Sequence, residues 1–492
     1  MPKSWPDQLL QMLLTLAVIL STALTIFIIT LPSSYSHFQS GEITEEDFTE
    51  DDRQHAGRSG YSYYHNHRDT DGKLKTECTI QIVVLGDIGR SPRMQYHALS
   101  VASHGGRVDL IGYVESEVHP DVQRSRFISV VPIKPHPKQL QASNRLLFLL
   151  VAPLKVLWQV FSLYYALGYQ TKASKWMLVQ NPPSIPTMAV AQFVCFFRNT
   201  RLVIDWHNFG YSILAMRLGS RHPLVTLAKW YEGLFSQDAT AHFAVTNAMA
   251  RVLKKEWAVE ALALHDRPPN HFQPLTSIQR STFLASLPDT AKYAANIEDG
   301  SWRLIVSSTS WTADEDFALL LDALVDYSAR AAENERIPKI LAIITGKGPL
   351  KQYYLNHIQH SKENGKLPNV DITTAWLSAA DYASLLGSAD LGISLHTSSS
   401  GVDLPMKVVD MFGTGLPVVG WSKFEAWTEL VQEGKNGCGF DSAEGLTQLL
   451  QDLFGDDGQR LKILRQGALE ECNRRWDDEW MPVAGQLFQL KP

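Results

Sequence analysis

The segment VVLGDIGRSPRM, residues 83–94, has the composition of an anion-binding loop. It joins an apolar run to a helical pattern, and its glycine, acidic and basic members are Gly86, Asp87, Gly89, Arg90 and Arg93. Glycines let a ligand approach the backbone closely, while the first N–H groups of a helix and nearby arginines attract negative charge. The segment therefore predicts a diphosphate site, with an ordinary strand-to-helix turn as the alternative. Its spacing is not G-x-G-x-x-G, which disfavours a dinucleotide.

A second glycine-bearing loop lies in ITGKGPL, residues 344–350. It also follows an apolar run, and Lys347 stands between Gly346 and Gly348, where an ammonium group can meet phosphate. The G-K-[ST] ending of a nucleoside-triphosphate loop is missing, so the sequence does not support ATPase chemistry.

The third segment, SSSGVDLPMKVVDMFGTGLPVV at residues 398–419, places charged groups at the start of an expected helix. Pro405 suits the first turn of a helix that follows a loop of small residues. Asp403 and Asp410 are seven residues apart, about two helical turns, so both carboxylates can point along one face, with Lys407 between them. The alternative is a helix cap followed by an ordinary helical residue.

Short apolar runs and helical patterns alternate around these loops. The runs include TIQIVVLGD, RVDLIGYV, KWMLVQNP and RLVIDWHN, and the alternation restarts at WRLIVSSTS. Such alternation is typical of parallel strands joined by crossover helices. We expect two doubly wound α/β units at residues 76–285 and 301–492, joined by a Pro-bearing linker at 286–300, with the last helix a candidate to cross back. Ligands of such sheets bind at the carboxyl ends of the strands.

Composition excludes several classes of protein. The 492 residues carry 45 Lys and Arg against 51 Asp and Glu, a formal net charge of −6, so there is no basic field to attract nucleic acid. The four cysteines are scattered and form no C-x-x-C pair, which excludes a disulfide scaffold and a four-cysteine zinc site.

The N-terminal region predicts attachment to a membrane. Residues 9–31 run without a charge, and about 20 apolar residues suffice to cross a bilayer. The run is longer than the apolar core of a cleaved signal peptide. We expect a short tail at 1–8, a transmembrane anchor at 9–31 and a flexible acidic stalk at 32–75. Lys3 alone favours a cytosolic N-terminus, so charge leaves the orientation in the membrane open.

Four segments together carry a family resemblance. GDIGRSPRM, DWHNFGYS, VTNAMARVL and SSSGVDLPMKVVDMFGTGLPVV resemble segments of the chitobiosyldiphosphodolichol β-mannosyltransferases, and the likeness runs from about Ile80 to the C-terminus. The resemblance implies a GT-B glycosyltransferase fold of two Rossmann-like domains. It also implies transfer of mannose from GDP-mannose to GlcNAc2-diphosphodolichol in a β-1,4 linkage, giving the first mannose of the N-glycan lipid precursor. The expected location is the endoplasmic reticulum membrane, single-pass, with the catalytic domains facing the cytosol and other dolichol-pathway mannosyltransferases as candidate partners.

The resemblance distributes the loop residues between two substrates. Nucleotide-sugar transferases of this fold usually carry Glu-x7-Glu in the last segment; here Asp410 matches the second glutamate, Val402 stands at the first position, and Asp403 follows one residue late. Asp410 is therefore assigned to the ribose of GDP, while the sugar-binding role of Asp403 stays open. The donor-binding candidates are Gly346, Lys347, Gly348, Lys407, Asp410 and Asp403. The acceptor-diphosphate candidates are Gly86, Asp87, Gly89, Arg90 and Arg93.

The implied reaction needs a base. A β-mannoside made from an α-linked donor requires inversion at the anomeric carbon, with a base for the acceptor hydroxyl and positive charge for the departing GDP. Asp205 and His207 lie where the apolar run RLVIDWHN ends, and both are candidate catalytic residues. His207 is a candidate base, while Asp205 could be the base or could orient a partner. Glu232 and Asp87 are weaker candidates.

No obligatory protein-bound metal or other cofactor is expected. A D-x-D motif occurs at residues 314–316, but it opens an amphipathic pattern, so helix capping explains it more simply. Stimulation by divalent cations is left open.

The segment 145–168 is apolar nearly all round. It fits a buried crossover helix and a membrane-facing platform beside the dolichol chain equally well. The rival functions are another membrane-anchored GT-B transferase with a different sugar or acceptor, and a non-catalytic scaffold of the same fold. A dehydrogenase is set aside because G-x-G-x-x-G is missing.

Overall fold

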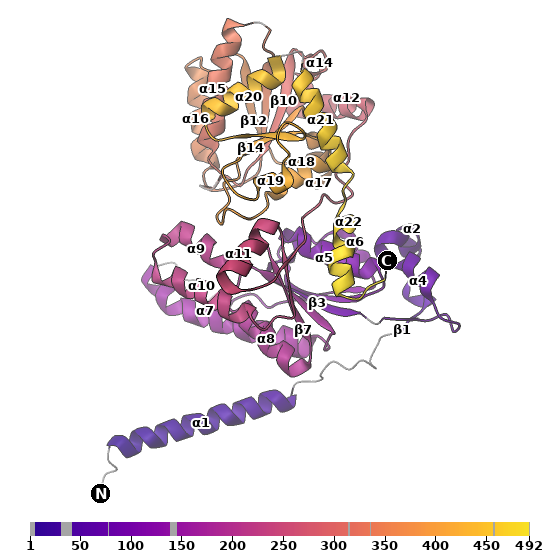
Figure 1. The fold of residues 1–492 in the computed structure, drawn as a ribbon, viewed down its shortest axis with the longest axis vertical. Coiled ribbons are helices and arrows are strands. Elements are labelled where there is room, and N and C mark those ends of the chain that lie inside the picture. The colour runs from indigo at the N-terminus through magenta and orange to yellow at the C-terminus, as the bar shows by residue number, and fades with distance from the viewer. Residues whose placement is uncertain are drawn as a thin grey trace. The chain divides into compact units, whose positions relative to one another are not determined.

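The computed structural model describes residues 5–30, 42–76, 78–137, 145–312, 315–334, 336–455 and 458–491. The chain divides into two compact units (Figure 1). The first comprises Met1–Trp206, Pro223–His242 and Gly485–Pro492, and the second comprises His207–His222 and Phe243–Ala484.

A seven-stranded sheet is the framework for the N-terminal half of the chain. Its strands, in sheet order, are β5 (Ile128–Pro132), β4 (Arg107–Tyr113), β3 (Thr79–Asp87), β6 (Trp176–Asn181), β7 (Arg201–Trp206), β8 (Ala241–Ala244) and β9 (Leu262–Ala263). The strand pairs β3/β4, β4/β5, β3/β6, β6/β7 and β8/β9 are all parallel. Ile82, Val83 and Val84 in the central strand are fully buried, as expected for a parallel strand covered on both faces.

The order of the strands decides which face each helix covers. Successive strands move one way from β3 to β5 and then the other way from β6 onward. Because parallel crossovers are right-handed, the helices of the two directions lie on opposite faces of the sheet. One face receives α5 (Pro92–Ser103) and α6 (Pro120–Arg124), and the other receives α7 (Arg145–Tyr165), α8 (Thr187–Arg198) and α10 (Pro223–Ser236). The remaining helices of this half are α9 (Gly210–Leu218) and α11 (Asn247–Trp257).

A second parallel sheet of six strands organises the C-terminal half. In sheet order its strands are β12 (Val370–Ala375), β11 (Lys339–Thr345), β10 (Trp302–Ser308), β13 (Leu391–Ser394), β14 (Val418–Trp421) and β15 (Gly437–Phe440). The helices that follow β10 along the chain are α15 (Phe317–Glu333), α16 (Lys351–Glu363), α17 (Ala379–Ser388), α18 (Met406–Gly413), α19 (Trp427–Leu430), α20 (Ala443–Gly455), α21 (Gln459–Cys472) and α22 (Trp476–Trp480). Buried strand residues such as Ile305 and Ile344 pack with Phe317 and Leu324 of α15. Two doubly wound units are therefore present, as the sequence predicts.

The expected linker at 286–300 is helical instead. It contains α13 (Pro288–Ala291) and α14 (Ala294–Glu298) and follows α12 (Ser277–Ser286). Thr276 and Gln279 form a capping box at the start of α12, and Pro288 occupies the first turn of α13, where a proline favours a helix rather than breaking it.

The expected stalk also differs from the prediction over its described residues, 42–75. β1 (Glu42–Ile43) pairs antiparallel with β2 (Leu74–Lys75), and between them lie η1 (Glu45–Asp47), α2 (Glu50–Gln54), α3 (Ala56–Ser59) and α4 (Tyr61–His67). Phe48 is buried, with its ring 4.9 Å from Tyr64 and 5.5 Å from Phe127. These aromatic side chains give the segment a core, but its helices are too short to produce a readable period.

At the N-terminus, α1 covers Trp5–Thr30 and exposes apolar side chains such as Met12, Val18 and Ile26. Within the described residues, no helix combines the length and the apolarity that crossing a bilayer requires. The transmembrane anchor at 9–31 stays a prediction.

The C-terminal residues belong to the first unit. After the π-helical turn Met481–Gly485, the fully buried Phe488 packs edge-on against Trp176, with ring centroids 5.5 Å apart. Lys175 Nζ donates to Gln489 Oε1 at 2.7 Å.

Candidate active site

Asp87 ends β3 and organises the first loop. Its Oδ1 accepts from the backbone N–H groups of Gly89, Glu115 and Ser116 at 3.1 to 3.3 Å. Burial raises the pKa of the Asp87 carboxyl, but hydrogen bonds from Ser116 and these N–H groups outweigh it and hold the pKa below its usual value. A carboxylate used in this way shapes the loop rather than accepting a proton from a substrate.

The two glycines of this loop have different structural reasons. A Cβ on Gly89 would lie 2.6 Å from the carbonyl oxygen of Glu117, so the packing of the chain itself requires glycine there. A Cβ on Gly86 would meet nothing closer than 3.7 Å, so Gly86 leaves room beside the backbone. Gly86 is therefore the glycine that a ligand can use.

The two arginines of the loop differ in their exposure and in their partners. Arg90 is largely exposed, and its Nε donates to Ser116 Oγ at 3.2 Å. Arg93 is buried, and its Nε and Nη2 donate to the two carboxylate oxygens of Asp205 at 2.8 and 2.9 Å. His97 Nε2 lies 3.2 Å from the same carboxylate. This buried group ties α5 to the end of β7.

The placement of Arg93 and Asp205 is at odds with a diphosphate role for Arg93 and with Asp205 as the base, and it fits the alternative that Asp205 orients a partner. Asp205 is fully buried and accepts a bidentate pair of charge-assisted hydrogen bonds, so it is not presented to a substrate as a base. The guanidinium of Arg93 is paired with that carboxylate and buried, so it is not presented to a diphosphate. Both side chains act as positioning residues for the strand end.

His207 is the first residue after β7 and is half-buried. The strand end before it is fixed by Trp206, whose Nε1 donates to His242 Nδ1 at 3.2 Å. Burial lowers the pKa of His242 to about 4, so the ring is neutral and its Nδ1 can accept this bond. His207 thus directly follows the carboxyl end of β7, where the sequence predicts a base.

Glu232, the weaker candidate, is buried on α10. It accepts from Asn181 Nδ2 at 3.3 Å and from the Ser184 hydroxyl. These bonds hold the segment after β6 and give Glu232 a structural role.

In the second unit, glycines allow two loops to pack together. A side chain at Gly346 would overlap the Thr309 carbonyl oxygen, and one at Gly348 would overlap that of Ser310. The loop after β11 therefore lies directly against the loop after β10. Between the glycines, the exposed Lys347 holds its Nζ 3.7 Å from the centre of the Trp376 ring, a cation–π contact.

Lys407, in the first turn of α18, forms an ion pair with the buried Glu315. Glu315 also accepts from the Thr309 hydroxyl at 2.8 Å and from the Ser310 backbone N–H at 2.5 Å. The pair fixes an ammonium group beside the loop that follows β10. Sequence reasoning missed Glu315, whose partner is 92 residues away, although it correctly expected a helix cap: Asp316 accepts from Ala318 N at 3.0 Å.

Asp410 lies one helical turn beyond Lys407. Burial raises its pKa to about 8, with the charge of Asp266 adding to the effect and that of Lys407 opposing it. Its charge also helps raise the pKa of Tyr382, after the larger effect of burial, and the Tyr382 hydroxyl shares a 2.9 Å hydrogen bond with Ser308. Asp410 is thus a carboxyl group whose charged form is disfavoured and whose charge acts on Tyr382.

Asp403 is committed to its own loop. It accepts from Asn208 Nδ2 at 3.1 Å and from the Ser398 hydroxyl, and His396 Nε2 lies 3.3 Å away. Burial raises the pKa of Asp403, but His396 outweighs it and holds the pKa below its usual value. These bonds explain Asp403 as a support of the loop rather than as a sugar ligand.

The segment VTNAMARVL forms the start of α11 and is held by a carboxylate. Thr246 caps the helix by accepting from Met249 N at 2.9 Å, and its hydroxyl donates to the Val402 carbonyl at 2.6 Å. Glu429 accepts from the first two N–H groups of the helix, those of Asn247 and Ala248, at 2.7 Å each. An anion at a helix N-terminus is favourable, and here the chain supplies it.

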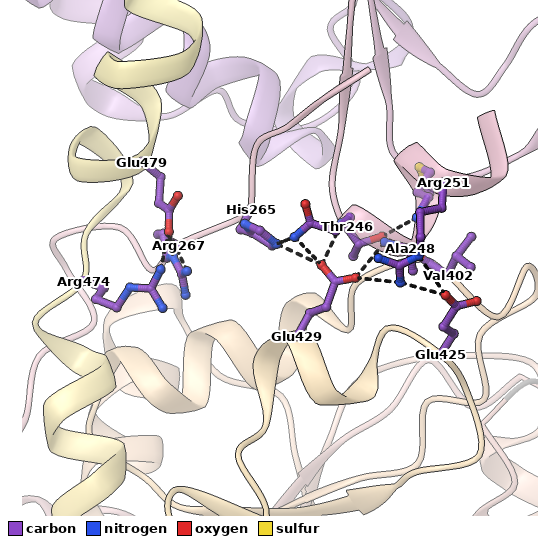
Figure 2. Close-up of polar contacts among 12 residues, drawn as sticks. Thr246, Ala248, Arg251, His265, Arg267, Val402, Glu425, Glu429, Arg474 and Glu479 are labelled. Atoms are coloured by element: carbon purple, nitrogen blue, oxygen red, sulfur yellow. Dashed lines mark hydrogen bonds and ion pairs between the residues drawn. The ribbon is translucent and has the colours of Figure 1, made fainter. Parts of the chain in front are cut away.

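Figure 2 shows the wider set of charges around this helix. His265 Nε2 lies 3.0 Å from Glu429, while Arg251 pairs with Glu425 at 2.7 Å. Further along, Arg267 contacts Glu471 and Glu479 at 2.6 Å each. These pairs bind residues 246–267 to α19 and to the C-terminal helices within the second unit.

Comparison with known proteins identifies related chains. Residues 304–456 match the family model described as glycosyl transferases group 1. The chain is 55% identical over 369 residues to the chitobiosyldiphosphodolichol β-mannosyltransferase of Arthroderma benhamiae, covering 74% of this chain and 82% of the relative. It is 40% identical over 434 residues to the human protein of the same name, covering 81% and 90%. It is also 40% identical over 463 residues to the UDP-glycosyltransferase TURAN of Arabidopsis thaliana, covering 85% and 98%.

Solved structures show the same fold. HepE from Anabaena in complex with UDP and glucose superposes with a TM-score of 0.58 at 16% identity, covering 83% of this chain and 98% of that one. WaaG, a glycosyltransferase of lipopolysaccharide biosynthesis, gives a TM-score of 0.55 at 12% identity, covering 82% and 98%. These likenesses, with the two parallel sheets, confirm the predicted GT-B fold.

We predict that Glu429→Ala lowers the free energy of unfolding of the protein by about 2 to 4 kcal/mol, because it leaves two helix N–H groups and His265 without their anion. Glu425→Ala, which removes an exposed carboxylate facing the same helix, is the matched control and should cost at most about 1 kcal/mol. Urea unfolding followed by tryptophan fluorescence measures both. Equal losses would contradict the role of Glu429.

The pH dependence gives the same test a second readout. Burial raises the pKa of Glu429, but His265 and the N–H groups outweigh it and lower the pKa to about 2, from an ordinary 4.5. Since the folded pKa lies below the unfolded one, this contribution is complete above about pH 4.5 and is lost as the pH falls toward 2. The Glu429→Ala protein should lack that part of the acid sensitivity.

Proposed function

Because the chain belongs to the chitobiosyldiphosphodolichol β-mannosyltransferase family, we propose that it transfers mannose from GDP-mannose to GlcNAc2-diphosphodolichol in a β-1,4 linkage. Membership makes it a glycosyltransferase and a dolichol-pathway β-mannosyltransferase. The donor, the residue roles and the membrane setting are our proposal. The product would be the first mannosylated form of the N-glycan lipid precursor.

The observation that carries the donor site is the ion pair of Lys407 with Glu315 at the carboxyl end of β10. The departing GDP gains negative charge as the bond from its phosphate to mannose breaks, and a fixed ammonium group stabilises that charge. Lys347 and the backbone at Gly346 and Gly348 are the neighbouring candidates for the same diphosphate. Asp410 would accept hydrogen bonds from the hydroxyl groups of the GDP ribose.

The acceptor half of the reaction is assigned to the first loop and the end of β7. Gly86 and the exposed Arg90 would receive the diphosphate of the lipid-linked acceptor, because both remain accessible. His207 would take the proton from the acceptor hydroxyl as its oxygen attacks the anomeric carbon. The C–O bond to GDP breaks on the opposite face, its electron pair leaves with GDP, and the α-linked sugar becomes β-linked. Asp205 and Arg93 would hold the end of β7, the strand that directly precedes His207.

We propose that this chemistry needs no resident metal. The lysines named above supply positive charge at the diphosphate instead. A divalent cation that stimulated the reaction would act through the substrate phosphates.

The membrane setting follows from the acceptor. We propose that residues 9–31 anchor the protein by a single span in the endoplasmic reticulum membrane, with the catalytic units on the cytosolic side. The exposed apolar side chains of α1 support this anchor. The product remains lipid-linked in the same membrane, which favours other dolichol-pathway mannosyltransferases as partners.

The experiment that tests this function is transfer of labelled mannose from GDP-mannose to a GlcNAc2-diphosphate lipid by the full-length protein. We expect a product that β-mannosidase cleaves, and inhibition by GDP but not by UDP. UDP is the informative competitor, because one relative is named a UDP-glycosyltransferase. Transfer from a UDP-sugar with none from GDP-mannose would contradict the proposed donor.

The proposed base can be tested by substitution. His207→Ala should lower kcat by about 10²- to 10⁴-fold, because proton removal loses its base, while the affinity for GDP stays unchanged. The matched control is His222→Ala, which removes a half-buried histidine from the same stretch of chain. Full turnover by the His207→Ala protein would remove this residue from the reaction.

A further inference from the structure

One side of the first unit exposes large apolar side chains on neighbouring helices. On α7, Leu154, Leu157 and Phe161 are exposed to between 51% and 63%. Their spacing of three and four residues puts them on a single helical face. Leu163 and Tyr164 of the same helix are buried. The helix therefore packs one apolar face against the unit and presents a second apolar face outward.

Helix α10 has the same two-sided character. Leu224, Leu227, Trp230 and Leu234 follow at spacings of three, three and four residues, and all four are exposed. The buried side of this helix carries residues such as Val225. A surface helix of a soluble domain normally carries polar residues on its outer face. Here that face is apolar instead.

Helix α8 joins the two stripes into one surface. The ring of Phe193 on α8 lies 6.2 Å from Tyr164 on α7, and the backbone N–H of Ala189 donates to Tyr231 on α10 at 3.2 Å. Phe196 on the outer side of α8 is 80% exposed. All three helices belong to crossovers that cover the same face of the sheet, and Figure 1 shows them next to one another.

The charged side chains that reach the surface of these helices are all positive. α7 and α8 contain no Asp or Glu, and the single acidic residue of α10, Glu232, is buried. Lys155 and Lys229 are the partly exposed charges among the described side chains of the three helices. This distribution contrasts with a chain whose net charge is −6. Apolar and aromatic side chains with nearby cations suit the interface of a bilayer with anionic headgroups.

We propose that this outer face of α7, α8 and α10, which we name the α7–α10 face, lies on the surface of the bilayer that holds the lipid acceptor. The inference rests on the proposed function, because a dolichol-linked substrate brings the enzyme to a membrane surface. It also resolves the two interpretations of residues 145–168: one side of α7 is a core face and the other is the platform. Contact at this face adds to the anchor and holds the first unit at the level of the headgroups.

Labelling at single cysteines tests the α7–α10 face in the full-length protein. The four native cysteines are buried, so an introduced exposed cysteine is the one that reacts. The test variants are Leu157→Cys and Leu227→Cys. The matched control is Gln123→Cys, on an exposed position of α6 at the opposite face of the sheet. Each is labelled with a polarity-sensitive fluorophore and reconstituted in phosphatidylcholine vesicles that contain anionic lipid.

We expect the labels at 157 and 227 to shift to shorter wavelength and to be quenched by spin-labelled acyl chains. The label at 123 should be quenched by aqueous iodide instead. Equal access of iodide to all three would overturn the proposal. Shielding at 157 and 227 without quenching by lipid would also overturn it, because α1 or a second copy of the chain would then cover the face. No outcome depends on catalysis, so a failure here is separate from a failure of the proposed function.

A kinetic readout complements the labels. Leu157→Ser combined with Leu227→Ser removes two exposed apolar side chains, so folding should be little affected. KM for an acceptor embedded in vesicles should rise by about tenfold, while KM for a water-soluble short-chain acceptor stays unchanged. An equal rise for both acceptors would place the effect in the acceptor site and contradict a role in docking.

Discussion

The ion pair of Lys407 with Glu315 is the interaction on which the second unit's site depends. A charge taken out of water is expensive unless it is paired and hydrogen-bonded. Glu315 is nearly buried, and Thr309 and Ser310 satisfy its remaining oxygen while Lys407 neutralises it. This arrangement requires the loop after β10, the loop with Gly346 and Gly348, and the first turn of α18 to lie against one another. The position of the ammonium group that we propose to meet the donor diphosphate thus results from the packing of three loops.

A second buried ion pair, in the first unit, lies next to the residue that we propose as the base. Arg93 and Asp205 are buried together, and their bidentate hydrogen bonds join α5 to the end of β7. Neither side chain is presented to a substrate, but the pair fixes the backbone that carries His207. In both units the carboxylates named by the sequence mostly hold loops in place: Asp87, Asp205 and Asp403 each accept several hydrogen bonds from the chain. Arg90, His207, Lys347, Lys407 and Asp410 are the side chains that we propose to meet the substrates.

The fold and the positions of the candidate loops could be predicted from the sequence. The two sheets follow from the alternation of apolar runs and helical patterns, and each candidate loop lies where a strand ends. Side-chain pairing could not, because Arg93 and Asp205 are 112 residues apart and Lys407 and Glu315 are 92 apart. No local pattern indicates which arginine or lysine will pair with a distant carboxylate. The short helices within 45–67 and 288–298 were missed for another reason: their caps and aromatic contacts act over too few residues to produce a period.

The central claim is that Glu315 holds Lys407 where it can stabilise the departing GDP. A double-mutant cycle on the single-turnover rate at saturating donor tests it most directly, with Glu315→Gln, Lys407→Met and the double variant. We expect Glu315→Gln alone to slow the reaction by about 30-fold or more, and to add hardly any loss when Lys407→Met is already present, which corresponds to a coupling energy of about 2 kcal/mol or more. Independent, additive losses would contradict the account, because Lys407 would then act without its carboxylate.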